Sequence, residues 1–253
     1  MITNGQTGTN IHEVAPRIYR INTPIDIPGS DFSFNQYLVA ADEPLIFHTG
    51  PKKLFPLVAD AIRKVMPIER LRYVGFSHFE ADECGSLAEF LAIAPNSEAL
   101  CSGIAKMVSV DDVSVRPARG MADGEILSLG SHSVKWFDAP HVPHGWENGF
   151  LMETTTSTLL CGDLFTQPGH GKDPVTTGDI LSPSEAFRLQ MDYYAHAPTT
   201  RAAIERLAAE NPRVLACMHG SAWHGEGGKL LRALADSVAP AQRSPHLAHL
   251  IAA

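Results

Sequence analysis

Short apolar runs separated by turn residues open the chain. Residues 17–21 alternate between apolar and polar positions, which predicts a half-buried strand, and residues 24–29 punctuate it. Residues 36–40 and 44–47 are two apolar runs with a short connection between them, which is typical of a hairpin. Residues 1–10 are polar and contain glycine, so we expect a loosely held tail.

Helical and strand-like patterns alternate in the next part of the chain. Apolar residues recur at i, i+3, i+4 and i+7 across residues 53–65, which predicts an amphipathic helix that ends before Pro67. The pattern then predicts strands at residues 72–76 and 98–102, and helices at residues 87–93 and 103–108. The helix over residues 87–93 should begin near Gly85, so that its N-terminus faces the polar run before it.

The rest of the chain contains a second series of strands, followed by helices. Four short strands are predicted at residues 125–129, 133–139, 149–153 and 158–162. Helices are predicted at residues 182–195, 199–210 and 226–238, with a strand at 213–218. Residues 168–178 form the longest predicted loop, and residues 240–253 a tail or exchange arm. We predict a single domain over residues 1–253, of the α/β (α+β) class, in which two sheets pack face to face with helices outside.

Composition excludes several classes of function. The net charge is -8, the pI is near 5.8, and no lysine- or arginine-rich run occurs, so we expect neither nucleic acid nor a membrane as partner. The sequence also lacks a signal-like N-terminus or a long apolar run, which predicts a cytoplasmic protein. The cysteines have no C-x-x-C spacing, and we expect three of them to be small buried side chains; these three are Cys101, Cys161 and Cys217.

The polar run at residues 77–85 carries the first candidate chemistry. His78, Glu80 and Asp82 stand at alternate positions directly after the apolar residues 73–76. An extended or tightly looped backbone can aim such side chains at one point, whereas a helix would turn them about 200° apart. One imidazole with two carboxylates suits iron, manganese or zinc.

Three later strands also end in residues that bind metals. His141 and His144 lie in a proline-rich turn after one strand, Asp163 follows another, and His219 follows a third. Each of these residues alone would be explained by a solvated loop or by an aspartate that caps a turn. Their repeated placement at strand ends instead predicts a shared metal site.

The order of these residues resembles the metallo-β-lactamase superfamily over nearly the whole chain. Its first motif is usually H-x-H-x-D-H, but the flavodiiron and oxygen-binding diiron protein (ODP) branch has H-x-E-x-D, as this sequence does at residues 78–82. The later motifs of the family correspond to His141-Val142-Pro143, Cys161-Gly162-Asp163 and His219-Gly220. The resemblance implies a four-layer αββα sandwich.

The resemblance also implies two metal ions that share one carboxylate. The first metal would take His78, Glu80, His141 and one oxygen of Asp163; the second would take Asp82, His219 and the other oxygen of Asp163. A carboxylate at position 80 in place of an imidazole adds negative charge, which favours iron over zinc. Two iron ions are therefore the expected cofactor, with zinc as the alternative.

Several residues depart from the family pattern or have open roles. Glu83 stands where the family usually has a histidine ligand of the second metal; it could ligate, point away or leave an open position, and His144 could fill the gap. His48, where the family usually has aspartate, and His224 could sit behind the ligands and orient them. His170, in the loop over residues 168–178, could form a wall of the site or a surface loop.

Three functions fit these observations. The first is a non-haem diiron oxidoreductase or oxygen-binding protein that acts on O2 or NO. Residues 1–253 contain no flavodoxin-like domain, so electrons would come from a separate flavoprotein or rubredoxin, and the family analogy favours a homodimer. The second is a metal-dependent hydrolase of the same fold, in which a metal-bound hydroxide attacks the substrate. The third is a non-catalytic sensor of diatomic gases.

Overall fold

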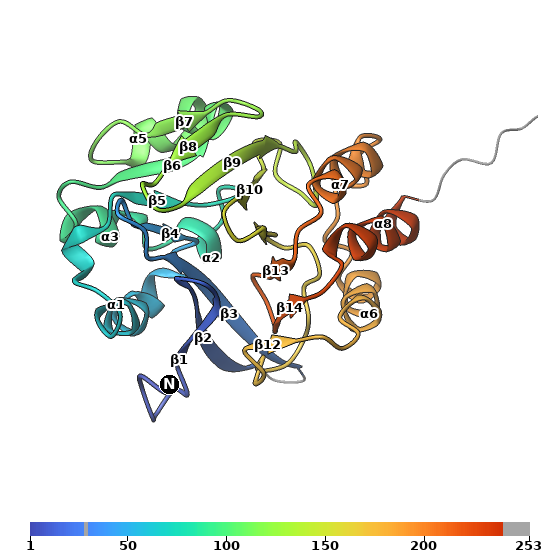
Figure 1. Ribbon diagram of the computed structural model, residues 1–253, viewed down its shortest axis with the longest axis horizontal. Helices are drawn as coiled ribbons and strands as arrows, with labels where there is room; N and C mark the ends of the chain where they lie inside the picture. Colours follow the sequence, from blue (N-terminus) through green and yellow to red (C-terminus); the bar gives the residue numbers. More distant parts are fainter. Residues whose placement is uncertain (28–29, 240–253) are drawn as a thin grey trace, which may run out of the picture.

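Two seven-stranded sheets form the centre of the protein, as seen in a computed structural model that describes residues 1–27 and 30–239 (Figure 1). In the first sheet the strands follow one another in chain order. They are β1 (Asn10–Ala15), β2 (Ile18–Ile27), β3 (Ser30–Val39), β4 (Leu45–Phe47), β5 (Tyr73–Gly75), β6 (Glu98–Ser102) and β7 (Arg119–Met121). The pairs from β1 to β4 are antiparallel and those from β4 to β7 are parallel.

Along the chain, the second sheet starts with four antiparallel strands, and the last of these pairs with a later strand in parallel. Its spatial order is β12 (Val175–Thr176), β14 (Ala222–His224), β13 (Val214–Ala216), β11 (Thr158–Leu160), β10 (Gly149–Glu153), β9 (Ser133–Asp138) and β8 (Ile126–Ser128). Because β11 and β13 are parallel, their carboxyl ends reach the same edge of the sheet.

Helices cover the outer face of each sheet (Figure 1). On the first sheet lie α1 (Phe55–Arg63) and α3 (Leu87–Ile93), with the short α2 (Ala81–Cys84) between them in sequence. A further helical segment follows β6, made of α4 (Gly103–Ala105), a π-helical stretch (Lys106–Val110) and α5 (Asp111–Val113). On the second sheet lie α6 (Leu181–Met191), α7 (Thr200–Ala209) and α8 (Gly227–Val238).

Alternating side chains of the strands divide the apolar interior into three cores. In β3, Tyr37 and Val39 belong to the core between the sheets, while Leu38 belongs to the core under α1 and α3. In β9, Trp136 belongs to the core between the sheets, and Phe137 belongs to the core under α6 to α8. This period of two is what a strand buried on both faces requires. The predicted four-layer αββα sandwich is confirmed.

The hairpin of β2 and β3 is longer than the sequence pattern predicted. Residues 24–29 were expected to end a strand, yet β2 continues to Ile27 and Pro24 pairs with Ser33. The last pair between β1 and β2 is Asn10 with Asn22, so β2 has no partner on that side at Pro24. Proline has no N–H to donate, and it is tolerated at this position because no neighbouring strand on that side needs one.

The amino-terminal residues are tied to the first sheet, in contrast to the loose tail that we expected. Thr3 N donates to Thr9 O at 2.8 Å, and Ile11 N donates to Met1 O at 2.8 Å. The predicted tail at residues 240–253 lies outside the described residues. Strands β1, β7, β12 and β14 were not predicted, because they are short or rich in polar residues.

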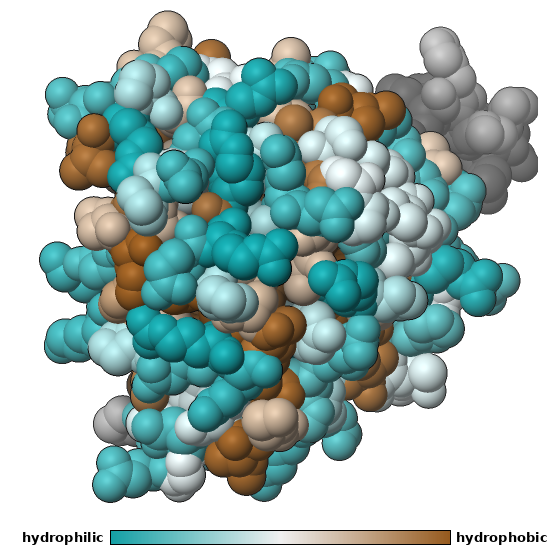
Figure 2. Space-filling view, turned by 60° about the vertical axis from the view of Figure 1, so that its left-hand side comes forward, coloured by the Kyte–Doolittle hydropathy of each residue, from teal (hydrophilic) through white to brown (hydrophobic). Residues whose placement is uncertain are grey.

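Polar side chains dominate the face in Figure 2, where apolar areas are smaller and lie between them. The predicted burial of Cys101, Cys161 and Cys217 is confirmed, and Cys84 is buried too. Among residues 1–27 and 30–239, we find no helix with the length and apolarity needed to cross a membrane.

Candidate metal centre

The loops that follow strands of both sheets meet at one place. Gly149 N, at the start of β10, donates to Ser77 O at 3.0 Å, which ties the loop after β5 to the second sheet. Met218 N donates to Gly162 O at 3.1 Å, which holds the ends of β11 and β13 together. Residues at the strand ends of separate sheets are thereby brought to a common centre.

The loop after β5 changes conformation within its polar run. Glu80 has an extended backbone (φ −128°, ψ 166°) and immediately precedes α2, whereas Asp82 and Glu83 lie in the first turn of α2. The expectation of an extended or tightly looped backbone therefore holds for the bends at residues 77–80, with Glu80 itself extended. Asp82 reaches the centre from a helical turn instead.

The first group of side chains surrounds one carboxylate oxygen of Asp163. His78 Nε2 lies 3.6 Å from Asp163 Oδ2 and 3.6 Å from Glu80 Oε2. His144 Nε2 lies 3.3 Å from the same Asp163 oxygen and 3.4 Å from Glu80 Oε1. Two imidazoles and two carboxylates therefore converge on one point.

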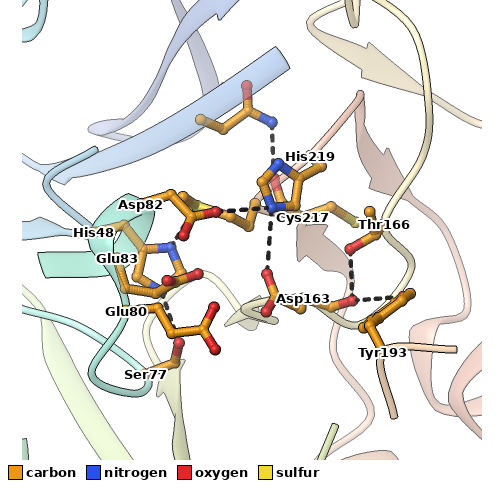
Figure 3. Close-up of polar contacts among 12 residues, drawn as sticks. His48, Ser77, Glu80, Asp82, Glu83, Asp163, Thr166, Tyr193, Cys217 and His219 are labelled. Atoms are coloured by element: carbon orange, nitrogen blue, oxygen red, sulfur yellow. Dashed lines mark hydrogen bonds and ion pairs between the residues drawn. The ribbon is translucent and has the colours of Figure 1, made fainter. Parts of the chain in front are cut away.

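The second group surrounds the other oxygen of Asp163 (Figure 3). His219 Nε2 lies 3.3 Å from Asp163 Oδ1 and 3.6 Å from Asp82 Oδ2. The two oxygens of Asp163 thus face different groups, which is the arrangement that a carboxylate needs to bridge two metal ions.

Each histidine is oriented by a contact at its other ring nitrogen. His144 Nδ1 lies 2.9 Å from Tyr193 O, and His219 Nδ1 lies 2.9 Å from Ser33 O. A carbonyl oxygen only accepts, so it fixes the proton on Nδ1 and leaves the Nε2 lone pair free for a metal. His78 Nδ1 lies 3.0 Å from Ser77 Oγ, which can hold His78 in the same way.

Buried atoms without hydrogen-bond partners test whether the residues fit metal ions. Among the described residues, His78 Nε2, His144 Nε2 and Asp163 Oδ1 are buried and have no hydrogen-bond partner. Buried polar atoms are normally satisfied. Two atoms that are each about 2.1 Å from one metal ion lie about 3.0–3.4 Å apart in octahedral or tetrahedral geometry, close to the separations within both groups. The donor set therefore fits metal ions.

The charges of the centre displace the pKa values of its acids. Burial acts to raise the pKa of Asp163, but the close approach of His219 and the charges of His78 and His144 outweigh it, so this pKa lies below its usual range. The close approach of the imidazoles of His144 and His78 lowers the pKa of Glu80 to about 2. Both carboxylates therefore stay ionised at neutral pH and are ready to bind a cation.

The pKa values of two histidines and of Glu83 move upwards in the metal-free centre. Burial acts to lower the pKa of His219 and His144, but nearby carboxylates outweigh it and raise both. Burial raises the pKa of Glu83 well above its usual value, and the charges of Asp163 and Asp82 add to this effect. Negative charge therefore dominates the centre when no cation is bound.

The structure brings His144 to the centre, and not His141. His141 is exposed and has a left-handed backbone (φ 65°), with its N–H donating to Gly145 O at 2.8 Å. No group of clustered metal-binding side chains in the described part of the chain includes it. Gly145 lets the turn pass close to His78: it has φ +73°, and a Cβ there would lie 3.0 Å from His78 Cβ.

Three further histidines were named from the sequence as supporting residues. His48 lies behind the centre, where its Nε2 is 3.0 Å from Ser77 Oγ and therefore linked to His78. Burial lowers the pKa of His48 to about 3, so it is neutral at pH 7. His224 is exposed on β14, and His170 contacts Asp26 at 3.0 Å, so neither lies with the groups above.

An aromatic mouth beside the second group was not predicted from the sequence. The cavity there has a volume of about 150 Å³ and is lined by Phe32, Asp82, His144, Asp163, Thr166, Phe187, Met191, Tyr193 and His219. The ring of Phe32 stacks on that of His219, with 4.4 Å between centroids. Phe187 and Met191 belong to α6, far from the metal loop in sequence, so no local motif could have indicated them.

A buried polar network fixes the loop that carries His219. Tyr37 Oη and Asn35 Nδ2 each donate to Cys217 O at 2.8 Å. Asn35 Nδ2 and Arg20 Nη2 each donate to Gly220 O at 2.7 Å. The first sheet therefore determines the position of a side chain that follows the second sheet.

Comparison with known proteins identifies relatives. A family model described as ODP family beta lactamase matches residues 32–220. The anaerobic nitric oxide reductase flavorubredoxin of Enterobacter sp. (strain 638) is 24% identical over 230 residues, covering 85% of this chain and 46% of that protein. Its homolog in Escherichia coli O157:H7 is also 24% identical, over 85% of this chain and 54% of that protein. This chain spans about half the length of these relatives.

Solved structures share the same architecture. Rubredoxin oxygen:oxidoreductase from Desulfovibrio gigas has a TM-score of 0.75 at 20% identity, covering 90% of this chain and 60% of that one. The flavodiiron protein from Giardia intestinalis has a TM-score of 0.77 at 16% identity, covering 90% of this chain and 59% of that one. At these identities the likeness establishes the fold.

Proposed function

The chain belongs to the ODP family beta lactamases, and from this premise we propose that it is a non-haem diiron oxidoreductase that acts on O2 or NO. The observation that carries the proposal is the pair of ligand groups that share Asp163, one group at each of its oxygens. The predicted hydrolase and gas sensor are the competing functions.

We infer the ligands of each metal from the positions of the donor atoms. The first metal would be held by His78, Glu80, His144 and one oxygen of Asp163. The second would be held by Asp82, His219 and the other oxygen of Asp163. When bound, a pair of iron ions supplies a place for a diatomic ligand and electrons to reduce it. His144 takes the place that the sequence resemblance gave to His141.

The protein's own residues would orient the centre and limit what reaches it. Carbonyl groups of Tyr193 and Ser33 hold His144 and His219 with their Nε2 atoms toward the metals. The cavity beside the second group has a volume of about 150 Å³ and opens to the surface at Met191, which is exposed. Its phenylalanine and methionine side chains would suit an uncharged diatomic molecule.

Electron supply and assembly are part of the proposal. The relatives are named as a flavorubredoxin and a rubredoxin oxygen:oxidoreductase, which supports a flavoprotein or a rubredoxin as the electron donor. We propose that a separate protein fills this role. The homodimer and the cytoplasmic location stay predictions.

Metal content and redox behaviour test the proposal. Protein produced with iron and zinc both supplied should contain about two irons per chain, with an absorption band that is lost on reduction. The reduced protein should consume O2 or NO when a chemical reductant is present. Two zinc ions with ester or phosphodiester hydrolysis would refute the redox function, and bound iron that never turns over either gas would favour the sensor.

A further inference from the structure

Glu83 is a buried carboxylate that the six ligands of the proposed centre leave without a role. Its side chain is 0% exposed, and neither of its carboxylate oxygens has a hydrogen-bond partner among the described residues. Its backbone is fixed, because Thr49 N donates to Glu83 O at 2.7 Å. Burying a polar group without a partner is costly, so a missing cation is the simplest explanation.

The surroundings of Glu83 supply other ligands. Glu83 Oε2 lies 3.8 Å from His78 Nε2, which is itself buried and without a hydrogen-bond partner. Single ligand atoms of His78, Glu80 and Glu83 all lie within 4.8 Å of one another. The remaining neighbours that act on Glu83 are the carboxylates of Asp163 and Asp82. Among the described residues, no lysine or arginine forms an ion pair with Glu83, and the imidazole of His78 is its one ion-pair partner.

We propose that Glu83 is itself a metal ligand, with Oε2 directed at the metal held by His78 and Glu80. The inference deepens the proposed function, and it requires metal at these residues but not the redox reaction. The centre then contains four carboxylates, from Glu80, Asp82, Glu83 and Asp163, whose charges balance two divalent cations. Oxygen donors of this number make the site harder, which favours iron over zinc.

A glutamine at position 83 separates this role from a structural one. Glu83→Gln keeps the size of the side chain and removes its charge. Anaerobic titration with Fe2+, followed by calorimetry, should give an affinity at least about tenfold lower than that of the wild type. The melting temperature of the metal-free variant should be unchanged or higher, because a carboxylate among like charges has been neutralised.

A matched control is available beside the same loop. Glu147 is 8% exposed, and its Oε1 accepts a hydrogen bond from Phe79 N at 2.9 Å, which a glutamine oxygen can also accept. Glu147→Gln should therefore bind Fe2+ as the wild type does. Equal affinity in Glu83→Gln and the wild type would overturn the proposal, as would equal losses in both glutamine variants.

A second substitution keeps the test decisive if Glu83→Gln does not fold. Glu83→His replaces the oxygen donor by a nitrogen donor, so the ratio of Fe2+ to Zn2+ affinity should shift toward zinc by about threefold or more. An unchanged ratio would overturn the proposal. Turnover of O2 or NO is not measured in these titrations, so a zinc-binding wild type would refute the redox function while a ligand role for Glu83 could still be supported.

Discussion

Replacing His144 by alanine should remove one of the four side chains that surround the first metal position. His144 Nε2 lies 3.3 Å from Asp163 Oδ2 and 3.4 Å from Glu80 Oε1. Substituting a residue that hydrogen-bonds a metal ligand usually lowers metal affinity about 10- to 100-fold. Loss of the ligand itself should therefore lower the affinity at least about 100-fold, or about 2.7 kcal/mol. The contact with Tyr193 O is also lost, which costs about 1 kcal/mol of metal-free stability.

His141 provides the control for this substitution, because it lies three residues away in the same loop and is exposed. Its left-handed backbone (φ 65°) makes asparagine a better replacement than alanine. We expect His141→Asn to bind metal as the wild type does, when both variants are titrated anaerobically with Fe2+ and analysed for metal content. Loss of metal from His141→Asn, with retention in His144→Ala, would refute the assignment.

Three further predictions concern the bridge, the polar network and pH. Asp163→Ala should lose both metals, because its two oxygens face both groups; elemental analysis that still finds two metals per chain would exclude the bridging role. Tyr37→Phe should lower the free energy of unfolding of the metal-free protein by about 1 kcal/mol in urea, since Cys217 O loses one donor and keeps Asn35, and an unchanged unfolding curve would argue against the network. The raised pKa values of His144 and His219 favour the folded state below their unfolded value of about 6.5, so this stability is lost as pH rises through their folded values. Metal binding requires both imidazoles to be neutral. In thermal melts from pH 8 to 6, the metal-free protein should therefore gain stability from these groups, while the rise in melting temperature on adding metal should shrink. A rise that grows on acidification would contradict the assignment.

The sequence was sufficient to locate candidate ligands that directly follow apolar strands. His78, Asp163 and His219 each come within three residues of the end of a buried strand, at β5, β11 and β13. The strand fixes the position of the backbone, so the next side chains have little freedom. Apolar patterning therefore predicted both the layers of the fold and these members of the centre.

The sequence could not decide between His141 and His144, because both lie in a turn of ten residues between β9 and β10. The outcome depends on left-handed residues at His141 and Gly145 and on contacts with distant chain segments. Tyr193, which orients His144, follows α6 and is 49 residues away in sequence. Tertiary contacts of this kind determine which histidine lies at the centre, and they leave no periodic signal in the local sequence.

The proposed centre links the two sheets, which has a consequence for stability. His78 follows the first sheet, while Asp163 and His219 follow the second, so bound metals would connect the two layers. The link is reinforced from the first sheet by Ser33 O, which holds the His219 ring. An ion that binds only the folded sandwich stabilises it, by about 2.7 kcal/mol when its free concentration is 100 times its Kd. Removal of metal should therefore loosen the packing between the sheets first, and the outer helices only after it.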